Sequence, residues 1–217
     1  MNIEQARFNM IEQQIRPWDV LDTAVLELLA VVKREDFVPP AYRALAFVDT
    51  EVPLPEGQVM LAPRVEARLL QEAKVQRHET VLEIGAGSGF MAALLGHRAQ
   101  RVISLEIRPA LVKMATDNLR RAGLSNVTVR EADGSQGLAA EGPFDVIMLS
   151  GSVAAVPQVL LDQLKVGGRL VAVEGEEPVM RATLRTRTSA SGITKVDLFD
   201  TVLPRLDDFA EVSRFHF

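Results

Sequence analysis

The stretch from Val81 to Phe90 constrains the fold of this chain more than any other part of the sequence. It reads VLEIGAGSGF, an apolar run that ends in three glycines placed at every second position. Such a run is typical of a buried strand, and the glycines allow a tight turn in which the backbone approaches a ligand closely. The residues after Phe90 are typical of a helix. Strand, glycine turn and helix in this order predict a nucleotide-type cofactor site at the edge of a parallel sheet.

The residues beyond the glycine turn alternate between predicted strands and predicted helices. Strands are expected at 101–106, 127–130, 144–149 and 169–174, and helices at 109–122 and 157–165. This alternation implies right-handed crossovers and a parallel sheet covered on both faces. Residues 180–188 and 192–202 alternate apolar with polar side chains instead, which favours antiparallel strands. We therefore expect a doubly wound α/β fold, with a mostly parallel seven-stranded sheet and antiparallel C-terminal strands.

Residues 1–75 are expected to form an N-terminal helical cap and a substrate loop, within the same domain as an α/β core at 76–217. Amphipathic patterns predict a helix over residues 2–15, a second one capped by Asp19 or Asp22, and a third over 64–73. The segment 48–63 between the last two is too rich in proline for a central strand, so we expect an irregular loop there.

The composition excludes several classes of chemistry. The chain has 217 residues, a formal net charge of −5 and no cysteine, so disulfides, thiolate metal sites and cysteine nucleophiles are excluded. Nucleic-acid partners usually leave a basic footprint, which this acidic balance lacks. The polar N-terminus is not a signal peptide, and the apolar runs stay short of membrane-spanning length. We expect a cytoplasmic protein with no nucleic-acid partner, no membrane partner and no metal; His78, His97 and His216 fall in no motif.

The spacing of the glycines distinguishes between cofactors. In the dinucleotide fingerprint the third glycine follows the second by three positions, but here that position is Phe90 and the third glycine is Gly89. A phosphate-binding P-loop is excluded because no Gly-Lys-Ser/Thr follows. The spacing of Gly85, Gly87 and Gly89 matches S-adenosylmethionine-dependent methyltransferases better. A purely structural turn is the alternative.

Acidic residues near the ends of successive strands favour the cofactor site. Glu106 closes the next strand, about 20 residues on, where a carboxylate can accept hydrogen bonds from both ribose hydroxyls. Asp133 and Gly134 follow the third strand, and Asp133 is expected to receive the exocyclic amine of adenine. Glu83 is expected to face the amino group of the methionine part. The structural alternatives are a solvated strand end, an Asp-Gly turn and a helix-dipole partner, respectively.

Six segments together form a pattern that is more specific than the glycine turn alone. They are Arg34–Pro39, Pro53–Gln58, Val81–Phe90, Asp133–Gly137, Pro143–Ile147 and Val173–Glu177. In these segments, between about Leu21 and Glu177, the chain resembles the protein-L-isoaspartate O-methyltransferases. The resemblance implies S-adenosylmethionine as cofactor and methylation of isoaspartyl carboxylates in damaged proteins.

Members of the family position the acceptor with a Ser or Thr hydroxyl, in a motif like Ile-Ser-x-Pro, and with backbone amides. Here Leu61 stands at the hydroxyl position and Arg64 at the following His or Tyr position. Leucine cannot donate a hydrogen bond to a carboxylate, and it makes burial of an anion costly. The family's Arg-Phe-Val-Pro-Leu-type strand is only loosely echoed by residues 201–206.

The sequence offers two replacements for the missing hydroxyl. Arg64 could bind a substrate carboxylate as a bidentate partner, or it could be an ordinary arginine at a helix start. Ser150 and Ser152 follow the fourth strand, where they could supply hydroxyls to the acceptor or simply belong to a turn.

Three functions are compatible with these observations. The first is an isoaspartyl-type carboxyl methyltransferase acting on proteins or peptides. The second is a methyltransferase on the same scaffold with another, unidentified acceptor, which Leu61 favours. The third is a cofactor-binding protein without catalytic activity. A nucleic-acid methyltransferase is disfavoured because there is no Asn-Pro-Pro-Tyr-type motif, no cysteine and no basic excess.

Overall fold

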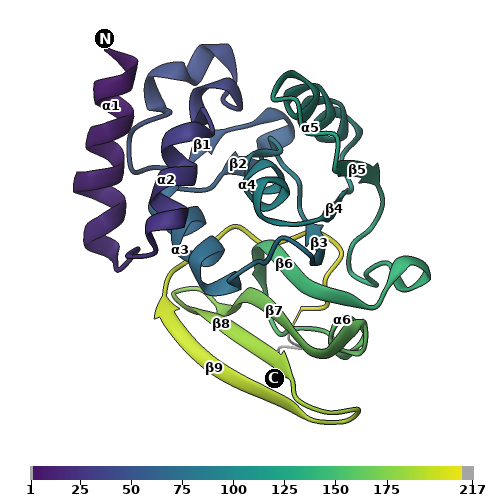
Figure 1. Cartoon of the computed structure of the whole chain (residues 1–217). Helices are drawn as coiled ribbons and strands as arrows, with labels where there is room; N and C mark the ends of the chain where they lie inside the picture. The colour runs from purple at the N-terminus through teal and green to yellow at the C-terminus, as the bar shows by residue number, and fades with distance from the viewer. Residues whose placement is uncertain (1, 212–217) are drawn as a thin grey trace, which may run out of the picture.

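The computed structural model describes residues 2–211; Met1 and residues 212–217, which include His216, lie outside the described part. The N-terminal third is helical (Figure 1). Helix α1 (Ile3–Met10) continues as a π-helical stretch over Ile11–Ile15 and a 3-10 turn over Arg16–Trp18. Helix α2 (Thr23–Val31) follows, and after it come 3-10 turns at Arg34–Asp36, Pro40–Leu45 and Pro55–Gly57.

Local capping explains where the first two helices begin. The side chain of Asn2 accepts a hydrogen bond from the backbone N–H of Gln5, and Asp22 accepts one from Ala24. These bonds satisfy N–H groups that have no partner inside a helix. The predicted loop over 48–63 carries two short strands, β1 (Val52–Pro53) and β2 (Val59–Met60), which pair antiparallel before α3 (Pro63–Ala73).

The main sheet has seven strands in the order β5-β4-β3-β6-β7-β8-β9. Strands β3 (Thr80–Ile84), β4 (Arg101–Glu106), β5 (Val127–Glu131), β6 (Phe144–Val153) and β7 (Leu164–Glu176) run parallel. Strands β8 (Val179–Arg187) and β9 (Ile193–Asp200) extend it as an antiparallel meander. The predicted fold class is thus confirmed. The chain order reverses beside β3, which places a crevice at the carboxyl ends of β3 and β6.

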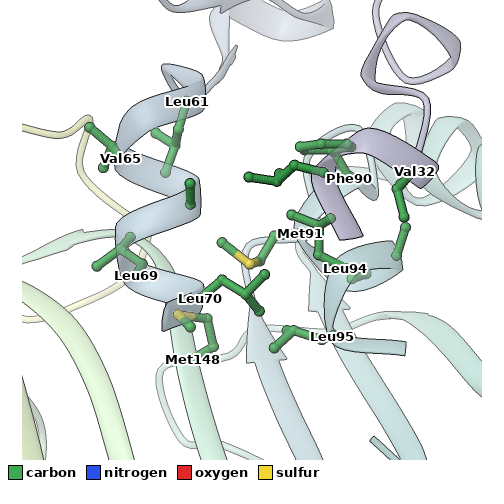
Figure 2. Close-up of a cluster of buried hydrophobic side chains, with 14 of the residues drawn as sticks. Val32, Leu61, Val65, Leu69, Leu70, Phe90, Met91, Leu94, Leu95 and Met148 are labelled. Carbon is green, nitrogen blue, oxygen red and sulfur yellow. The ribbon is translucent and has the colours of Figure 1, made fainter. Parts of the chain in front are cut away.

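Apolar side chains alternate along the parallel strands and fill two cores, one on each face of the sheet. On one face, Val81, Val102 and Val146 pack under α3, α4 (Phe90–Arg98) and α5 (Pro109–Arg121). The same core contains apolar residues of the N-terminal helices, so the cap and the sheet are packed together. Figure 2 shows where α3 meets α4 within this core. On the other face, Leu82 and Ile147 pack under α6 (Gln158–Asp162) and the C-terminal segment.

Two predicted boundaries differ from the structure. Strand β6 runs to Val153 instead of ending at 149, so Ser150 and Ser152 lie within the strand and not after it. The second difference concerns the start of β7. Helix α6 ends at Asp162, and β7 begins at Leu164, before the glycine pair that was expected to precede it. Gly167 has a φ of 86°, and a Cβ on Gly168 would lie 3.0 Å from the carbonyl oxygens of Phe144 and Asp145. The glycine pair therefore forms an irregularity inside the strand rather than a loop before it.

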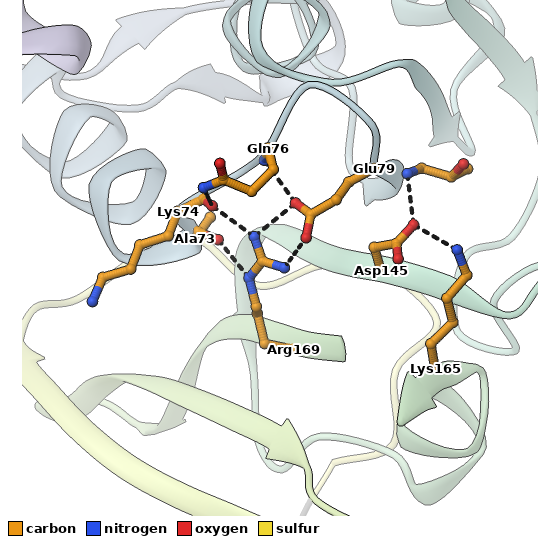
Figure 3. A network of polar contacts seen from close by, with 8 residues as sticks. Ala73, Lys74, Gln76, Glu79, Asp145, Lys165 and Arg169 are labelled. Carbon is orange, nitrogen blue, oxygen red and sulfur yellow. Dashed lines mark hydrogen bonds and ion pairs between the residues drawn. The ribbon is translucent and has the colours of Figure 1, made fainter. Parts of the chain in front are cut away.

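The edge of the sheet opposite the crevice is fixed by a polar network (Figure 3). Arg169 on β7 binds the Glu79 carboxylate through two nitrogens and also donates to the carbonyls of Ala73 and Lys74, which end α3. The carboxylate of Asp145 accepts from the backbone N–H of Thr80. These contacts join the end of α3 to the starts of β3, β6 and β7.

Beyond β9 the chain turns back across the carboxyl ends of the central strands (Figure 1). This C-terminal segment, residues 201–211, forms a short parallel bridge between Arg205 and Ser152 on β6. The Ser152 backbone N–H donates to Pro204, and the Leu206 N–H donates to the Ser152 carbonyl. The segment therefore forms part of the rim of the crevice.

Candidate cofactor and acceptor site

The glycine turn joins β3 to α4 in a conformation that glycine adopts readily. Gly85, Gly87 and Gly89 have φ of 92°, 52° and 84°, all in the left-handed region. The backbone N–H of Gly85 donates to the Leu105 carbonyl at 2.8 Å, and that of Gly87 donates to a Glu106 carboxylate oxygen at 2.9 Å. The turn is therefore fixed to the end of β4.

A cavity of about 70 Å³, which we call the outer cavity, lies beside this turn. Of the residues predicted to bind the cofactor, Gly85, Gly87, Glu106 and Gly134 line it. The second oxygen of the Glu106 carboxylate accepts from the backbone N–H of Arg108 at 3.1 Å. Two backbone donors therefore orient this carboxylate at the end of β4, beside the cavity.

Two of the predicted residues have other contacts. Gly89 is the N-cap of α4, and a Cβ at this position would lie 3.1 Å from the Cα of Ala115 on α5, so glycine permits the two helices to pack. The Asp133 carboxylate accepts from the backbone N–H of Ser135 at 2.8 Å and from its hydroxyl at 2.9 Å. Its neighbour Gly134 lines the outer cavity, but the Asp133 oxygens close a turn. Its contact with adenine stays a prediction.

Glu83, at the end of β3, is fully buried next to the glycine turn. Its two carboxylate oxygens accept from the hydroxyls of Ser104 at 2.5 Å and Ser150 at 2.8 Å. Burial raises the pKa of Glu83 to about 8, against the opposing effect of the two hydroxyl hydrogen bonds, while the charges of Glu66 and Glu106 add to the rise. The site therefore holds an acid that retains its proton near neutral pH until a positive group approaches.

A second, smaller cavity of about 30 Å³, the inner cavity, lies on the other side of the same residues. Gly85, Gly87, Val59 and Ser150 line both cavities. The inner cavity extends to Leu61, just before α3, and to Glu66 in the first turn of that helix. The cofactor-type site therefore adjoins the segment in which the acceptor motif was predicted.

Glu66 and Arg34 form a buried ion pair beside the inner cavity, with 3% and 1% of their surfaces exposed. Arg34 Nη1 donates to Glu66, and Nη2 donates to the Leu61 carbonyl at 2.6 Å. The guanidinium also lies over the ring of Phe90, 5.1 Å from its centroid. Burial raises the pKa of Glu66 to about 7, although the charge of Arg34 opposes the rise. The sequence assigned no role to Glu66, because its partner is 32 residues away in the chain.

The residues predicted for the acceptor side do not all lie at one place in the structure. Leu61 is buried in the apolar core between α3 and α4, and it lines the inner cavity (Figure 2). Arg64 is not among the residues that line either cavity. It pairs with Asp49 at 2.8 Å, and its guanidinium lies 4.0 Å from the centroid of the Trp18 ring. The structure thus brings Leu61 and Ser150 together at the glycine turn, whereas Arg64 contacts the cap.

The two serines near the end of β6 have different contacts. Ser150 lines both cavities and donates its hydroxyl proton to Glu83. Ser152 is fully buried, and its hydroxyl donates to the Leu203 carbonyl at 2.8 Å. Ser152 therefore fixes the C-terminal segment rather than facing a cavity.

The C-terminal wall of the outer cavity was missed in the sequence. Arg205, Leu206, Asp207 and Phe209 all line it. Arg108 connects this wall to the loop over residues 48–63, because it pairs with Asp207 at 2.6 Å and lies 3.6 Å from the Glu56 carboxylate. The only sequence signal was the weak similarity of residues 201–206 to a family motif. This stretch has no periodic pattern that would predict its position beside the cavity.

The sequence as a whole was compared with known families and structures. The profile of a family described as protein-L-isoaspartate(D-aspartate) O-methyltransferase matches residues 5–198, most of the chain. The chain belongs to this family. It is accordingly an enzyme of the S-adenosylmethionine-dependent methyltransferase type.

Individual relatives in the family agree. A protein-L-isoaspartate O-methyltransferase 1 from Syntrophobacter fumaroxidans is 37% identical over 205 residues, which cover 91% of this chain and 96% of the relative. A Methanoculleus marisnigri protein-L-isoaspartate O-methyltransferase is 40% identical over 169 residues, covering 78% and 77%. A Plasmodium falciparum crystal structure, described as a putative protein-L-isoaspartate O-methyltransferase in complex with S-adenosyl-L-homocysteine, superposes with a TM-score of 0.79 at 22% identity. The match covers 95% of this chain and 99% of the other, and it supports the fold.

The residues at the glycine turn fit the family's cofactor. Gly85 and Gly87 present bare backbone to both cavities, and a Cβ on Gly85 would already lie 2.8 Å from Leu206. The Glu106 carboxylate at the end of β4 can accept from ribose hydroxyls, and buried Glu83 is suited to an ammonium group. When bound, S-adenosylmethionine supplies an electrophilic methyl group at this place.

Residues 2–211 contain neither a metal-type cluster of side chains nor a membrane-spanning helix. No cluster of three or more His, Cys, Asp or Glu side chains with metal-binding geometry occurs in this part of the chain. None of its helices has the length and apolar character needed to cross a membrane.

Proposed function

We propose that this enzyme transfers a methyl group from S-adenosylmethionine to the carboxylate of isoaspartyl residues in damaged proteins. The observation that carries the proposal is the meeting of the two cavities at Val59, Gly85, Gly87 and Ser150. The outer cavity has the residues for the cofactor, and the inner one is bordered by the segment that holds the acceptor motif in the family. We expect the enzyme to act in the cytoplasm.

The reaction needs little acid–base chemistry, because a carboxylate is already a nucleophile and the sulfonium methyl group is activated. Catalysis then depends mainly on holding the carboxylate in line with the methyl group. Met60, Leu61, Phe90 and Met91 give the inner cavity an apolar lining that keeps water away from the transfer. On this proposal Glu83 and Glu106 orient the cofactor, and α3 orients the acceptor.

Calorimetry and a transfer assay test the proposal separately. S-adenosylmethionine should bind, and incubation with methyl-labelled cofactor and an isoaspartyl peptide should yield a base-labile methyl ester. The matching peptide with normal aspartate is the control and should stay unlabelled. If the cofactor binds and no ester forms at any pH, the acceptor is different or the protein is catalytically silent.

The variant Leu61→Ser is expected to increase kcat/KM for the isoaspartyl peptide about 10-fold at pH 8. The reason is a restored hydroxyl donor, since hydrogen bonds to charged groups contribute about 1.5–3 kcal/mol. The change also removes a buried side chain, so the free energy of unfolding should fall by about 2–4 kcal/mol. Leu61→Ala is the control, because it loses the same volume without gaining a donor. Equal kinetics for the two variants would show that the hydroxyl does not help in this acceptor site.

The affinity for S-adenosylmethionine is expected to rise with pH between about 6 and 7.5. Release of one full proton on binding would raise the affinity about 10-fold per pH unit, and we expect a smaller rise than that. Glu83 is protonated in this range because its pKa is about 8 in the free protein. A facing ammonium group favours the ionised form, so binding must release a proton, which is easier at higher pH. Dissociation constants from calorimetry at several pH values check this. Glu83→Gln should bind more weakly and without this pH dependence; an equal slope in that variant would locate the titrating group elsewhere.

A further inference from the structure

The acceptor carboxylate needs a hydrogen-bond donor that Leu61 cannot provide. Three polar side chains line the inner cavity: Glu66, Ser88 and Ser150. The Ser150 hydroxyl proton is directed to Glu83. Ser88 belongs to the glycine turn and therefore lies on the cofactor side. Glu66 remains as the polar side chain on α3, the element that begins directly after Leu61.

Glu66 is held in a fixed position beside the cavity. Arg34 binds its carboxylate and, through its other terminal nitrogen, the carbonyl of Leu61. The same guanidinium is stacked against Phe90, which also lines the inner cavity. Glu66 and the backbone of the family's hydroxyl position are therefore tied to one immobile cation, which gives Glu66 a defined orientation at the site of the missing donor.

The charges of the site require a proton when an anionic acceptor binds. The titratable groups that face Glu66 are Arg34, from the 3-10 turn after α2, and Glu83, at the end of β3. On binding, the acceptor brings a further carboxylate into this buried place. With Glu66 neutral, the positive charges of Arg34 and of the cofactor's sulfonium and ammonium groups face the carboxylates of Glu83, Glu106, the cofactor and the acceptor. Ionised Glu66 would add one more buried negative charge, which is unfavourable in a low-dielectric interior.

We propose that Glu66, held by Arg34, binds the acceptor as a neutral carboxylic acid and donates to its carboxylate the hydrogen bond that Leu61 cannot donate. This inference rests on the proposed isoaspartyl acceptor and names a residue that selects for it. Arg34 then neutralises the acceptor carboxylate in place of Glu66. The proton is taken up from solvent when the acceptor binds and is returned after the neutral methyl ester has left, so no group is consumed.

Burial already raises the pKa of Glu66 to about 7 in the free protein, so the required proton is accessible at neutral pH. Below that pH Glu66 carries it before the acceptor arrives, and acceptor affinity is constant. Above that pH Glu66 must take up a proton when the acceptor binds. The proton concentration falls 10-fold per pH unit, so the affinity for the acceptor decreases by up to about 10-fold per unit. Acceptor affinity should therefore decrease with rising pH, opposite to the expected trend for the cofactor.

The experiment measures binding rather than turnover. The protein is saturated with S-adenosylhomocysteine and titrated calorimetrically with an isoaspartyl peptide that is acetylated and amidated at its ends and contains no other ionisable group. The thioether of S-adenosylhomocysteine carries no positive charge, so the need for a neutral Glu66 is at least as strong in this complex as with the sulfonium cofactor. The parent chain should bind about 50-fold more weakly at pH 9 than at pH 7. Titrations in two buffers of different ionisation enthalpy should show uptake of nearly one proton at pH 8.

Two variants and one control complete the test. Glu66→Gln keeps a donor and an acceptor for Arg34, so its peptide affinity should vary less than about 3-fold over the same pH range. Glu66→Leu lacks the donor and should bind at least about 10-fold more weakly than the parent at pH 7. Glu131→Gln changes an exposed glutamate at the end of β5 and should behave like the parent. Glu66→Leu leaves the buried Arg34 without its anion and should melt at a lower temperature. Unchanged cofactor affinity and a cooperative thermal unfolding transition identify folded variants.

The outcomes separate this inference from the proposed function. Peptide binding that does not vary with pH, or the same pH dependence in Glu66→Gln, overturns the role of Glu66 and leaves isoaspartyl methylation intact. A methyl ester formed by Glu66→Leu with the parent's KM has the same meaning. No binding of the peptide to the parent chain at any pH overturns the proposed function itself.

Discussion

A chain in which valine replaces Gly87 is expected to bind S-adenosylhomocysteine at least about 100-fold more weakly than the parent. Gly87 has a φ of 52° and borders both cavities, and its N–H donates to Glu106. A Cβ at this position has one neighbour within 4 Å, Leu54 at 3.4 Å, so the protein itself can accommodate it. The branched side chain therefore occupies the space of the cofactor. A 100-fold loss corresponds to about 2.7 kcal/mol of binding free energy.

Backbone strain alone predicts a different result, and a matched control separates the two causes. Gly123, after α5, has a φ of 74° and open space around its Cβ position. Valine at either position should lower the free energy of unfolding by about 1–3 kcal/mol. Calorimetry should detect the loss of cofactor binding in Gly87→Val and normal binding in Gly123→Val. Normal binding in both variants would mean that the cofactor does not lie against Gly87.

Arg34→Ala is expected to lower the free energy of unfolding by about 3–5 kcal/mol at pH 8, because it leaves the buried Glu66 carboxyl without its cation. The loss should depend on pH. The pKa of Glu66 is raised above its ordinary value in the folded protein, so its contribution to stability is greatest below about pH 4.5 and decreases as the pH rises through about 7. Removing the cation raises that pKa further, and the decrease then continues to higher pH, at about 1.4 kcal/mol per unit.

Urea denaturation at pH 5 and pH 8 measures this difference. The double variant Arg34→Met with Glu66→Leu should regain most of the stability, since a buried pair is often replaceable by apolar residues. Arg16→Ala is the comparison at the surface, where Arg16 pairs with Glu12 on the same helix, and it should change stability little. An equal loss at both pH values would show that packing against Phe90 and the bond to Leu61, rather than charge, account for the stability provided by Arg34.

The sequence predicts those parts of the site that depend on local geometry. The glycine turn and Glu106 belong to one strand-turn-helix-strand unit, in which glycine spacing and strand ends fix which groups meet. Gly134 follows the next strand, β5, and lines the outer cavity. The separate roles of the glycines were not predictable, because the demand for glycine at position 89 comes from Ala115 on another helix.

Contacts between distant segments set the limit of the prediction. Arg34 and Glu66 were both visible, but neither helical periodicity nor a motif indicates that one binds the other. Arg64 was considered for a carboxylate because of its position in the motif, yet Asp49 and the Trp18 ring occupy its guanidinium. The C-terminal wall depends on a chain reversal after β9, which side-chain alternation cannot predict. The acceptor side is therefore harder to predict from the sequence than the cofactor side, because it depends on ion pairs between distant segments.

The Arg108 contacts with Glu56 and Asp207 have a consequence for cofactor exchange. They join the loop over residues 48–63 to the C-terminal segment at the outer cavity, and their side chains are partly exposed. Ion pairs of this kind are screened by salt. We therefore expect the residence time of bound product to shorten as ionic strength rises, so that salt sets how quickly one turnover can follow another.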